Sequence, residues 1–135
     1  MPNQRYLQRI VIVLVAVVLT GASAEQSWFQ VRGGDWVVDA KTLTSLQGTF
    51  KDSLLGLARR THQQLLPFSR YRFQFQGQFS SGRKVVAIFG FCDDLGRKDL
   101  TEFFLAMLDG GQCFFGVTYS PDSGQLTELY VEGTA

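Results

Sequence analysis

The sequence predicts an α+β domain in which one long helix packs across an antiparallel sheet of about four strands, stapled by a single disulfide. Three observations lead to this fold class: an apolar stripe with helical spacing, four downstream segments with strand character, and two cysteines in all. A helix followed by strands that short turns connect is typical of α+β folds.

Residues 1–24 have the features of a secretory signal peptide. Arg5 and Arg9 precede an apolar run of about ten residues, and Ala22-Ser23-Ala24 fits the A-x-A cleavage pattern. The run is shorter than the roughly 20 apolar residues that span a bilayer. We therefore expect cleavage after Ala24, no stable membrane span afterwards, and a periplasmic or extracellular location. An uncleaved membrane anchor is the alternative.

The rest of the chain is predicted to form one domain behind a short leader. Residues 25–38 are interpreted as a flexible leader or an edge strand, with Gly33-Gly34 as a joint. Residues 39–135 are interpreted as a single α+β domain. Cleavage leaves roughly 110 residues, which is enough for one hydrophobic core.

A long helix is predicted to begin after Asp39 as the N-cap and to run to Leu66, because Pro67 disfavours helical angles in the residue before it. Its apolar stripe recurs with helical spacing at Leu43, Leu46, Phe50, Leu54, Leu57 and Leu65. Gly48 and Gly56 each lower helix stability by about 1 kcal/mol relative to Ala. These glycines either allow a close approach to the sheet or merely weaken the helix.

Residues 70–79 alternate between aromatic and polar side chains, as expected of a strand with two unlike faces. The aromatic face contains Tyr71, Phe73, Phe75 and Phe79, and the polar face contains Arg72, Gln74, Gln76 and Gln78. We expect the aromatic face to pack against the helix and the polar face to contact solvent. The polar face, together with Gly33 and Gly34, is the candidate interaction surface.

Three further strands complete the predicted sheet. Ser80-Ser81-Gly82 is a turn signal, and residues 84–92 are apolar on both faces, as in a central strand. Residues 113–119 and 126–132 flank Ser120-Pro121-Asp122-Ser123-Gly124, whose Pro and Gly favour a hairpin.

Cys92 and Cys113 are predicted to form a disulfide, since two cysteines in an exported protein are typical of a structural bridge. Residues 99–109, between them, fit either a strand or a short helix that begins with the capping-box spacing of Asp99 and Glu102. We favour the helix, because a helical excursion returns Cys113 to the end of the sheet where Cys92 lies. Bridged Cα atoms must approach within about 7 Å.

A long helix, an antiparallel meander and the preceding Gly33-Gly34 resemble the cystatin layout. In that family a glycine segment and two hairpin loops wedge into a cysteine-protease cleft. Here residues 74–77 are one residue shorter than the family's Gln-x-Val-x-Gly loop and lack its Val, and Pro121 is followed by Asp122, not Trp. The resemblance therefore implies the layout of the helix and the sheet, without the loop motifs of the family.

The C-terminal half is similar to small exported bacterial proteins of unknown function. Their shared pattern is a Phe-Cys strand end, an Asp-Gly-Gly-x-Cys-Phe-Phe segment and a closing hairpin, which correspond here to residues 91–92, 109–115 and 114–132. This resemblance implies export and the fold, and no activity.

The sequence points to no catalytic, metal or cofactor site. His62 is the only imidazole, and no G-x-S-x-G nucleophile elbow occurs. The acidic cluster Asp93, Asp94, Asp99 and Glu102 lacks EF-hand spacing. Without Arg5 and Arg9, 11 basic and 12 acidic side chains remain, and this net charge of −1 gives no support for nucleic-acid binding.

We therefore expect an exported, non-enzymatic binding or inhibitory module that acts on another exported protein. Residues 25–92 carry nine basic and four acidic side chains, and residues 93–135 carry two and eight. The two halves either form opposed patches for a partner or neighbour each other in the fold. The alternative function is a carrier that holds a small apolar ligand between helix and sheet. A large apolar cavity would favour the carrier, and a filled core with an exposed apolar rim would favour the module.

Overall fold

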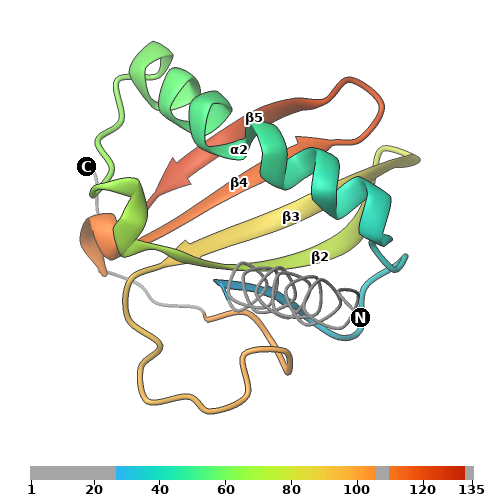
Figure 1. Ribbon diagram of the computed structural model, residues 1–135, viewed down its shortest axis with the longest axis horizontal. Coiled ribbons are helices and arrows are strands. Elements are labelled where there is room, and N and C mark those ends of the chain that lie inside the picture. Colours follow the sequence, from blue (N-terminus) through green and yellow to red (C-terminus); the bar gives the residue numbers. More distant parts are fainter. Residues whose placement is uncertain (1–26, 106–109, 133–135) are drawn as a thin grey trace, which may run out of the picture.

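The computed structural model describes residues 27–105 and 110–132. The predicted signal peptide and cleavage site lie outside these residues. Helix α2 crosses one face of a sheet, and the segment that follows β3 runs below the sheet in Figure 1. The α+β class is confirmed, with a mixed sheet that has one strand more than expected.

The spatial order of the strands follows the sequence: β1 (Trp28–Gln30), β2 (Arg72–Ser80), β3 (Arg83–Phe91), β4 (Phe114–Ser120) and β5 (Gln125–Val131). Strands β2 to β5 form the predicted antiparallel meander, with β3 at the centre. Strand β1 pairs with β2 in parallel, so part of the predicted leader is an edge strand. Ser81 and Gly82 join β2 to β3 with φ angles of 51° and 76°, as a type I′ turn requires.

Helix α2 spans Ala40–Arg60, and Asp39 is its N-cap, as predicted. The Asp39 carboxylate accepts a hydrogen bond of 2.7 Å from the Thr42 N–H. The predicted end near Leu66 is wrong, because the chain leaves the helix at Thr61. His62 has a left-handed φ of 55°, and the N–H groups of His62 and Gln63 donate to the carbonyls of Arg59 and Ala58. This Schellman motif closes the helix before Pro67 can act on it.

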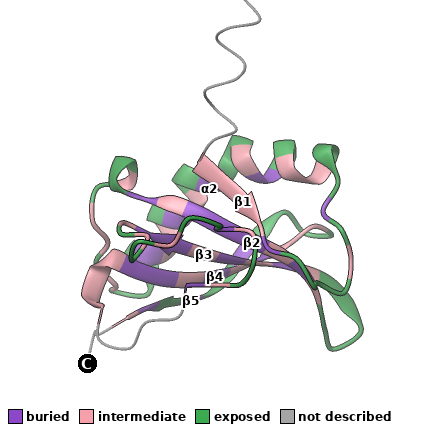
Figure 2. Cartoon of the chain, turned by 90° about the horizontal axis from the view of Figure 1, so that it is seen from below, coloured by how far each residue is buried: buried purple, intermediate pink, exposed green. Residues whose placement is uncertain are grey.

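The predicted helix–sheet core is confirmed. Leu46, Phe50, Leu54 and Ala58 of α2 are buried against Tyr71, Phe73 and Phe75 of β2. Leu43, Leu57 and Leu65 are half-buried at its border. The Phe73 ring centroid lies 5.1 Å from that of Phe50 and 4.6 Å from that of Trp28. Figure 2 shows buried residues along the middle strands of the sheet.

The hairpin end of β2 is covered by Trp36 and lies beyond the helix. A Cβ atom on Gly77 would lie 2.3 Å from the Trp36 carbonyl oxygen, and the Trp36 indole N–H donates to the Gln78 carbonyl at 2.9 Å. Gly77 therefore interrupts the aromatic alternation where Trp36 approaches. Phe79 lies farther toward the turn and is 53% exposed, so the prediction that it packs on the helix is wrong.

Part of the opposite face of the sheet, around Phe91 and Phe114, is covered by the chain that follows Cys92. Leu100 and Leu105 of this segment pack on Phe91 and Phe114 in a second apolar cluster. The expected helix is wrong for residues 99–105, which form neither helix nor strand, and residues 106–109 lie outside the described part of the chain. The covering segment adds a third layer, beneath the helix and the sheet.

Gln74 connects the sheet to this covering segment. Its side-chain amide donates hydrogen bonds of 2.8 Å to the Leu100 carbonyl and 2.9 Å to the Phe103 carbonyl. Its side-chain oxygen accepts a bond of 2.8 Å from the Leu105 N–H. Gln74 is fully buried, so the prediction that it contacts solvent is wrong.

The Cys92–Cys113 disulfide is confirmed, with a Cα–Cα distance of 5.0 Å. The two cysteines lie just beyond β3 and before β4, where the Cys92 N–H donates to the Cys113 carbonyl at 3.0 Å. They therefore meet on antiparallel neighbours, as predicted.

Replacing both cysteines with Ser should lower the free energy of unfolding by about 3 kcal/mol, because the bridge closes a loop of about 20 residues. Urea unfolding of the variant and of the wild type, with and without reductant, measures this loss. Equal unfolding midpoints for the variant and the oxidised wild type would contradict the prediction.

Gly48 offers a stabilising substitution. An added Cβ would meet no atom within 4 Å, so this glycine makes no close approach to the sheet. Gly48→Ala should therefore raise the free energy of unfolding by about 1 kcal/mol. Thermal unfolding checks this, with Gly77→Ala as the matched control that should lower stability because of Trp36. A Gly48→Ala variant less stable than the wild type would show that position 48 needs glycine.

Candidate functional site

The predicted interaction residues Gly33 and Gly34 lie in the loop between β1 and α2 and are exposed. Backbone hydrogen bonds connect this loop to the rest of the domain. The Arg32 N–H donates to the Thr101 carbonyl, and the Asp35 N–H donates to the Gly77 carbonyl, both at 2.9 Å. A Cβ on Gly34 would lie 2.6 Å from the Gly77 carbonyl oxygen. Gly34 thus approaches β2 closely, whereas a Cβ on Gly33 would meet no atom within 4 Å.

The four polar residues predicted on β2 share one face, and three of them contact other parts of the chain. Arg72 forms an ion pair of 3.2 Å with Asp94 and lies over the Phe91 ring. The Gln76 amide donates to the Arg32 carbonyl at 2.8 Å, and the Gln78 amide donates to Gln76 at 2.9 Å. Arg72, Gln74 and Gln76 thus hold other segments against β2, and the buried Gln74 interrupts the polar face.

The basic and acidic halves of the chain neighbour each other. Both ion pairs found in residues 27–105 and 110–132 join the two halves: Arg32 to Asp99 at 2.9 Å, and Arg72 to Asp94 at 3.2 Å. Hydrogen bonds from the Gly96 N–H and from Arg72 hold the pKa of Asp94 below its usual value. The contribution of these bonds to stability is therefore lost as the pH falls through that lowered pKa.

The carboxylates of Asp93, Asp94 and Asp99 accept hydrogen bonds from backbone N–H groups of their own loop. The Leu95 N–H donates to Asp93 and the Gly96 N–H to Asp94, each at 2.9 Å. The hydroxyl and the N–H of Thr101 donate to Asp99 and lower its pKa. In the described ranges, no group of three or more His, Cys, Asp or Glu side chains is placed to hold a metal ion.

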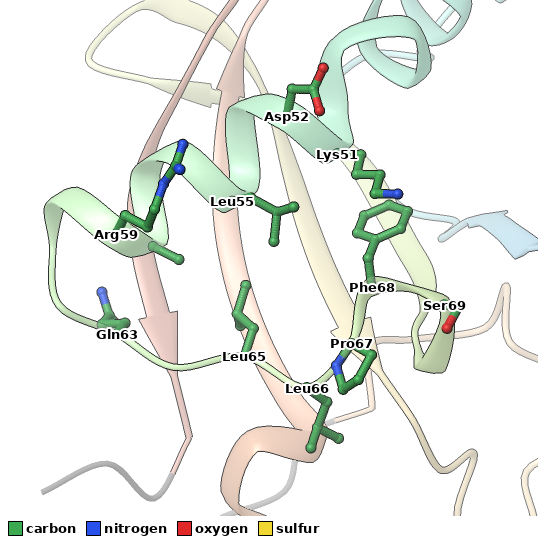
Figure 3. A pocket seen from close by; sticks show the side chains of 11 residues that line it. Lys51, Asp52, Leu55, Arg59, Gln63, Leu65, Leu66, Pro67, Phe68 and Ser69 are labelled. Atoms are coloured by element: carbon green, nitrogen blue, oxygen red, sulfur yellow. The ribbon is translucent and has the colours of Figure 1, made fainter.

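A groove of about 930 Å³ lies between the C-terminal half of α2 and residues 63–69, and we take this basic groove as the candidate site (Figure 3). Its floor is apolar, and charged and polar side chains form its rim. The floor contains Leu55, Ala58, Leu65, Leu66, Pro67 and Phe68, and the rim contains Lys51, Asp52, Arg59, Gln63 and Ser69.

The groove exists because the helix ends early and the chain turns back beside it. Gln63 fastens the start of the returning segment: its amide donates to the Leu129 carbonyl at 2.8 Å, and its oxygen accepts from the Val131 N–H at 3.2 Å. The Gln63 side chain thereby makes one donated and one accepted hydrogen bond with the backbone of the edge strand β5, as the backbone of a neighbouring strand would.

Tyr71 holds the returning segment at Leu66. Its hydroxyl accepts a hydrogen bond of 3.0 Å from the Leu66 N–H and donates to the Gln112 carbonyl. Partial burial raises the pKa of this hydroxyl. Because Gln63 and Tyr71 hold this segment at two points, the floor of the groove is preformed.

The cations of the rim form no ion pair with a carboxylate of the residues that the structure describes. The ion pairs in the described part of the chain do not include Lys51, Arg59 or Asp52. The Lys51 ammonium lies 5.8 Å from the centroid of the Phe68 ring, directly beside the apolar floor. Two cations and one carboxylate therefore give the groove a net positive charge.

This groove is not predicted by the sequence pattern. The spacing of the leucines places Leu65 in the buried stripe of a longer helix, whereas Leu65 lines an open groove. A signal was present: the basic pair Arg59-Arg60 is followed within a few residues by the apolar run Leu65 to Phe68, which contains a proline. In this sequence the basic end of the helix corresponds to the rim of the groove, and the apolar run that follows it corresponds to the floor.

A smaller depression of about 340 Å³ lies on the outer face of the sheet, where Phe89, Phe104, Gly116 and Tyr130 line it. Tyr130 is 60% exposed there.

Comparisons with protein-family models, curated proteins and solved structures find no match for this chain. Within the ranges that the structure covers, no helix combines the length and the apolar character needed to cross a membrane.

Proposed function

We propose that this chain is an exported, non-enzymatic binding module that acts on another protein, and that the basic groove contacts the partner. One observation carries the proposal: a preformed groove has an apolar floor and cations that form no ion pair among the described residues, and it lies on a domain whose helix–sheet interior is packed with aromatic rings around Phe73. Apolar surface surrounded by polar residues is typical of protein interaction sites.

The filled interior favours the module over the carrier. The space between helix and sheet holds the rings of Phe50, Phe73 and Phe115, which are at most 2% exposed. Phe73 lies 5.1 Å from Phe50 and 6.3 Å from Phe115, measured between ring centroids. A ligand held there, as the carrier alternative requires, would have to displace these rings.

The surroundings of the candidate acid–base groups support a non-enzymatic function. His62 is exposed just beyond the helix, where its backbone closes the Schellman motif. The carboxylates of Asp94 and Asp99 are occupied by ion pairs and by the turns of their own loop. General acid–base catalysis requires such groups to be aligned toward a substrate.

Export is part of the proposal, with cleavage of residues 1–24 and a mature start at Glu25. The disulfide supports it, because such bonds persist in oxidising compartments. Intact-mass measurement of the exported fraction tests it, and the expected mass is that of the chain starting at Glu25 with two fewer hydrogens. A full-length species in the membrane fraction would contradict it.

The binding function is tested with a charge placed on the groove floor. Leu55 is 36% exposed, so Leu55→Glu should fold normally and weaken partner binding by about tenfold or more. Val37→Glu is the matched control, since Val37 is 80% exposed outside the groove. The wild type is used to capture proteins from the exported fraction, and these proteins are identified. Each captured protein is then purified, and its affinity is measured for the wild type, Leu55→Glu and Val37→Glu.

Equal affinity of the captured protein for all three chains would contradict the groove as the contact site. Loss of binding only in Val37→Glu would move the contact to the loop before the helix. Co-purification of a small apolar molecule with the wild type, and of no specific protein, would overturn the module in favour of the carrier.

A further inference from the structure

We infer that the basic groove recognises an acidic, apolar peptide segment of its partner, with apolar side chains on the floor and carboxylates on Lys51 and Arg59. This inference rests on the proposed function and specifies the chemistry of the partner. Three features of the groove support it: the floor, the unpaired cations and the distance between them.

The floor offers contact to apolar side chains from two sides. Leu55 projects from α2, and Leu65 and Phe68 belong to the returning segment across from it, as Figure 3 shows. Gln63 and Tyr71 already hold that segment in place, so binding requires little ordering of the protein.

The unpaired cations select for carboxylates. A carboxylate that binds the Lys51 ammonium would lie next to the Phe68 ring, so the charged and apolar contacts of one peptide are adjacent. Hydrogen bonds between ammonium or guanidinium groups and carboxylates are among the strong ones in proteins. Asp52 is the single acid of the rim, and in Figure 3 its carboxylate points away from Leu65 and Pro67.

The separation of the cations favours a peptide over a fatty acid. Lys51 and Arg59 are eight residues apart on α2, which corresponds to a rise of about 12 Å. An extended chain advances about 3.3 Å per residue, so carboxylates about four residues apart reach both cations. A fatty acid has one carboxylate and can pair with only one of them.

The test uses the oxidised mature chain and a fluorescein-labelled probe peptide, Gly-Glu-Leu-Phe-Ala-Glu-Gly. Fluorescence anisotropy measures its affinity, alongside probes in which both Glu are Gln or in which Leu-Phe is Ser-Ser. Sodium dodecanoate is titrated as a competitor. We expect the first probe to bind most tightly and its affinity to fall as salt rises, since salt screens exposed charges.

Two double variants of the protein locate the binding. Lys51→Glu with Arg59→Glu should weaken binding of the Glu probe by about tenfold or more. Lys98→Glu with Arg83→Glu is the matched control, because both residues are exposed and lie outside the groove. The control should stay within about twofold of the wild type, and thermal unfolding checks that both variants fold.

The outcomes separate this inference from the proposed function. If the Gln probe binds as tightly as the Glu probe and Leu55→Glu weakens both, the groove binds peptides without selecting acids, and only the inference falls. If the captured partner binds through the groove but no probe binds, the inference again falls alone. If dodecanoate binds and neither a probe nor a partner does, both fall.

Discussion

Replacing Phe73 with Ala should lower the free energy of unfolding by about 3 to 5 kcal/mol, the cost typical of removing a buried aromatic ring. Phe73 is 2% exposed. Its ring lies between helix and sheet, with centroids of Trp28, Phe50, Phe68 and Phe115 within 4.6 to 6.3 Å. Removing it leaves a cavity that four rigid rings cannot easily fill.

Phe79→Ala is the matched control for this substitution. Phe79 lies on the same strand and, by the alternation, on the same face, but it is 53% exposed beyond the end of the helix. Its removal should cost less than about 1 kcal/mol, as for most surface substitutions. Urea unfolding followed by circular dichroism compares the two variants. Similar losses for both would show that the helix does not cover β2 at Phe73.

The alternation in residues 70–79 predicted the inner face of β2 correctly, because burying every second residue against a helix leaves a strong pattern. It could not predict what covers the outer face. A glutamine in contact with water and a glutamine bonded to the backbone of a covering loop look the same in sequence. Gln74 is of the second kind, and its partners lie 26 to 31 residues away.

Other differences between prediction and structure have local physical causes. Strand β1 has three residues, too few to show a period of two. The helix ends through His62 in the left-handed conformation, where glycine is the usual sign. Asp99 and Glu102 have the spacing of a capping box, but Leu100 and Leu105 insert separately into the apolar cluster on the sheet.

The basic groove could not be predicted because it depends on these same differences. A helix continuing to Leu66 would have placed Leu65 in the core and left no returning segment. Once the helix ends at Arg60, residues 63–69 lie opposite Leu55 and form the second wall. The site thus follows from one backbone conformation at His62.

Replacing Gln74 with Glu should destabilise the fold by about 4 kcal/mol or more at neutral pH, because it removes two donated hydrogen bonds and buries a charge. The two side chains have nearly the same shape, so packing stays intact. The new carboxylate would face the carbonyl oxygens of Leu100 and Phe103, which now accept from the amide. Only the bond from the Leu105 N–H would remain favourable.

This loss should depend on pH with a defined sign. Burial and the two carbonyls would raise the pKa of Glu at position 74 above its value in the unfolded chain. The folded state then binds the proton more tightly than the unfolded chain does. Relative to the wild type, the variant therefore loses least stability at a pH below the unfolded pKa, and it loses more stability as the pH rises through the raised pKa of the folded state. Unfolding free energies relative to the wild type at about pH 4 and pH 8, on either side of the usual Glu pKa, measure this dependence.

Gln78→Glu is the control for charge on the same strand, because Gln78 is half-buried and its amide donates only to Gln76 in the described part of the chain. It should change stability by less than about 1 kcal/mol at either pH. If both Glu variants match the wild type at pH 8, residues 100–105 do not lie on Gln74 and the outer face of the sheet is open to solvent. A large, pH-dependent loss for Gln74→Glu alone would establish the third layer, since only a covering segment can turn this polar strand position into a buried one.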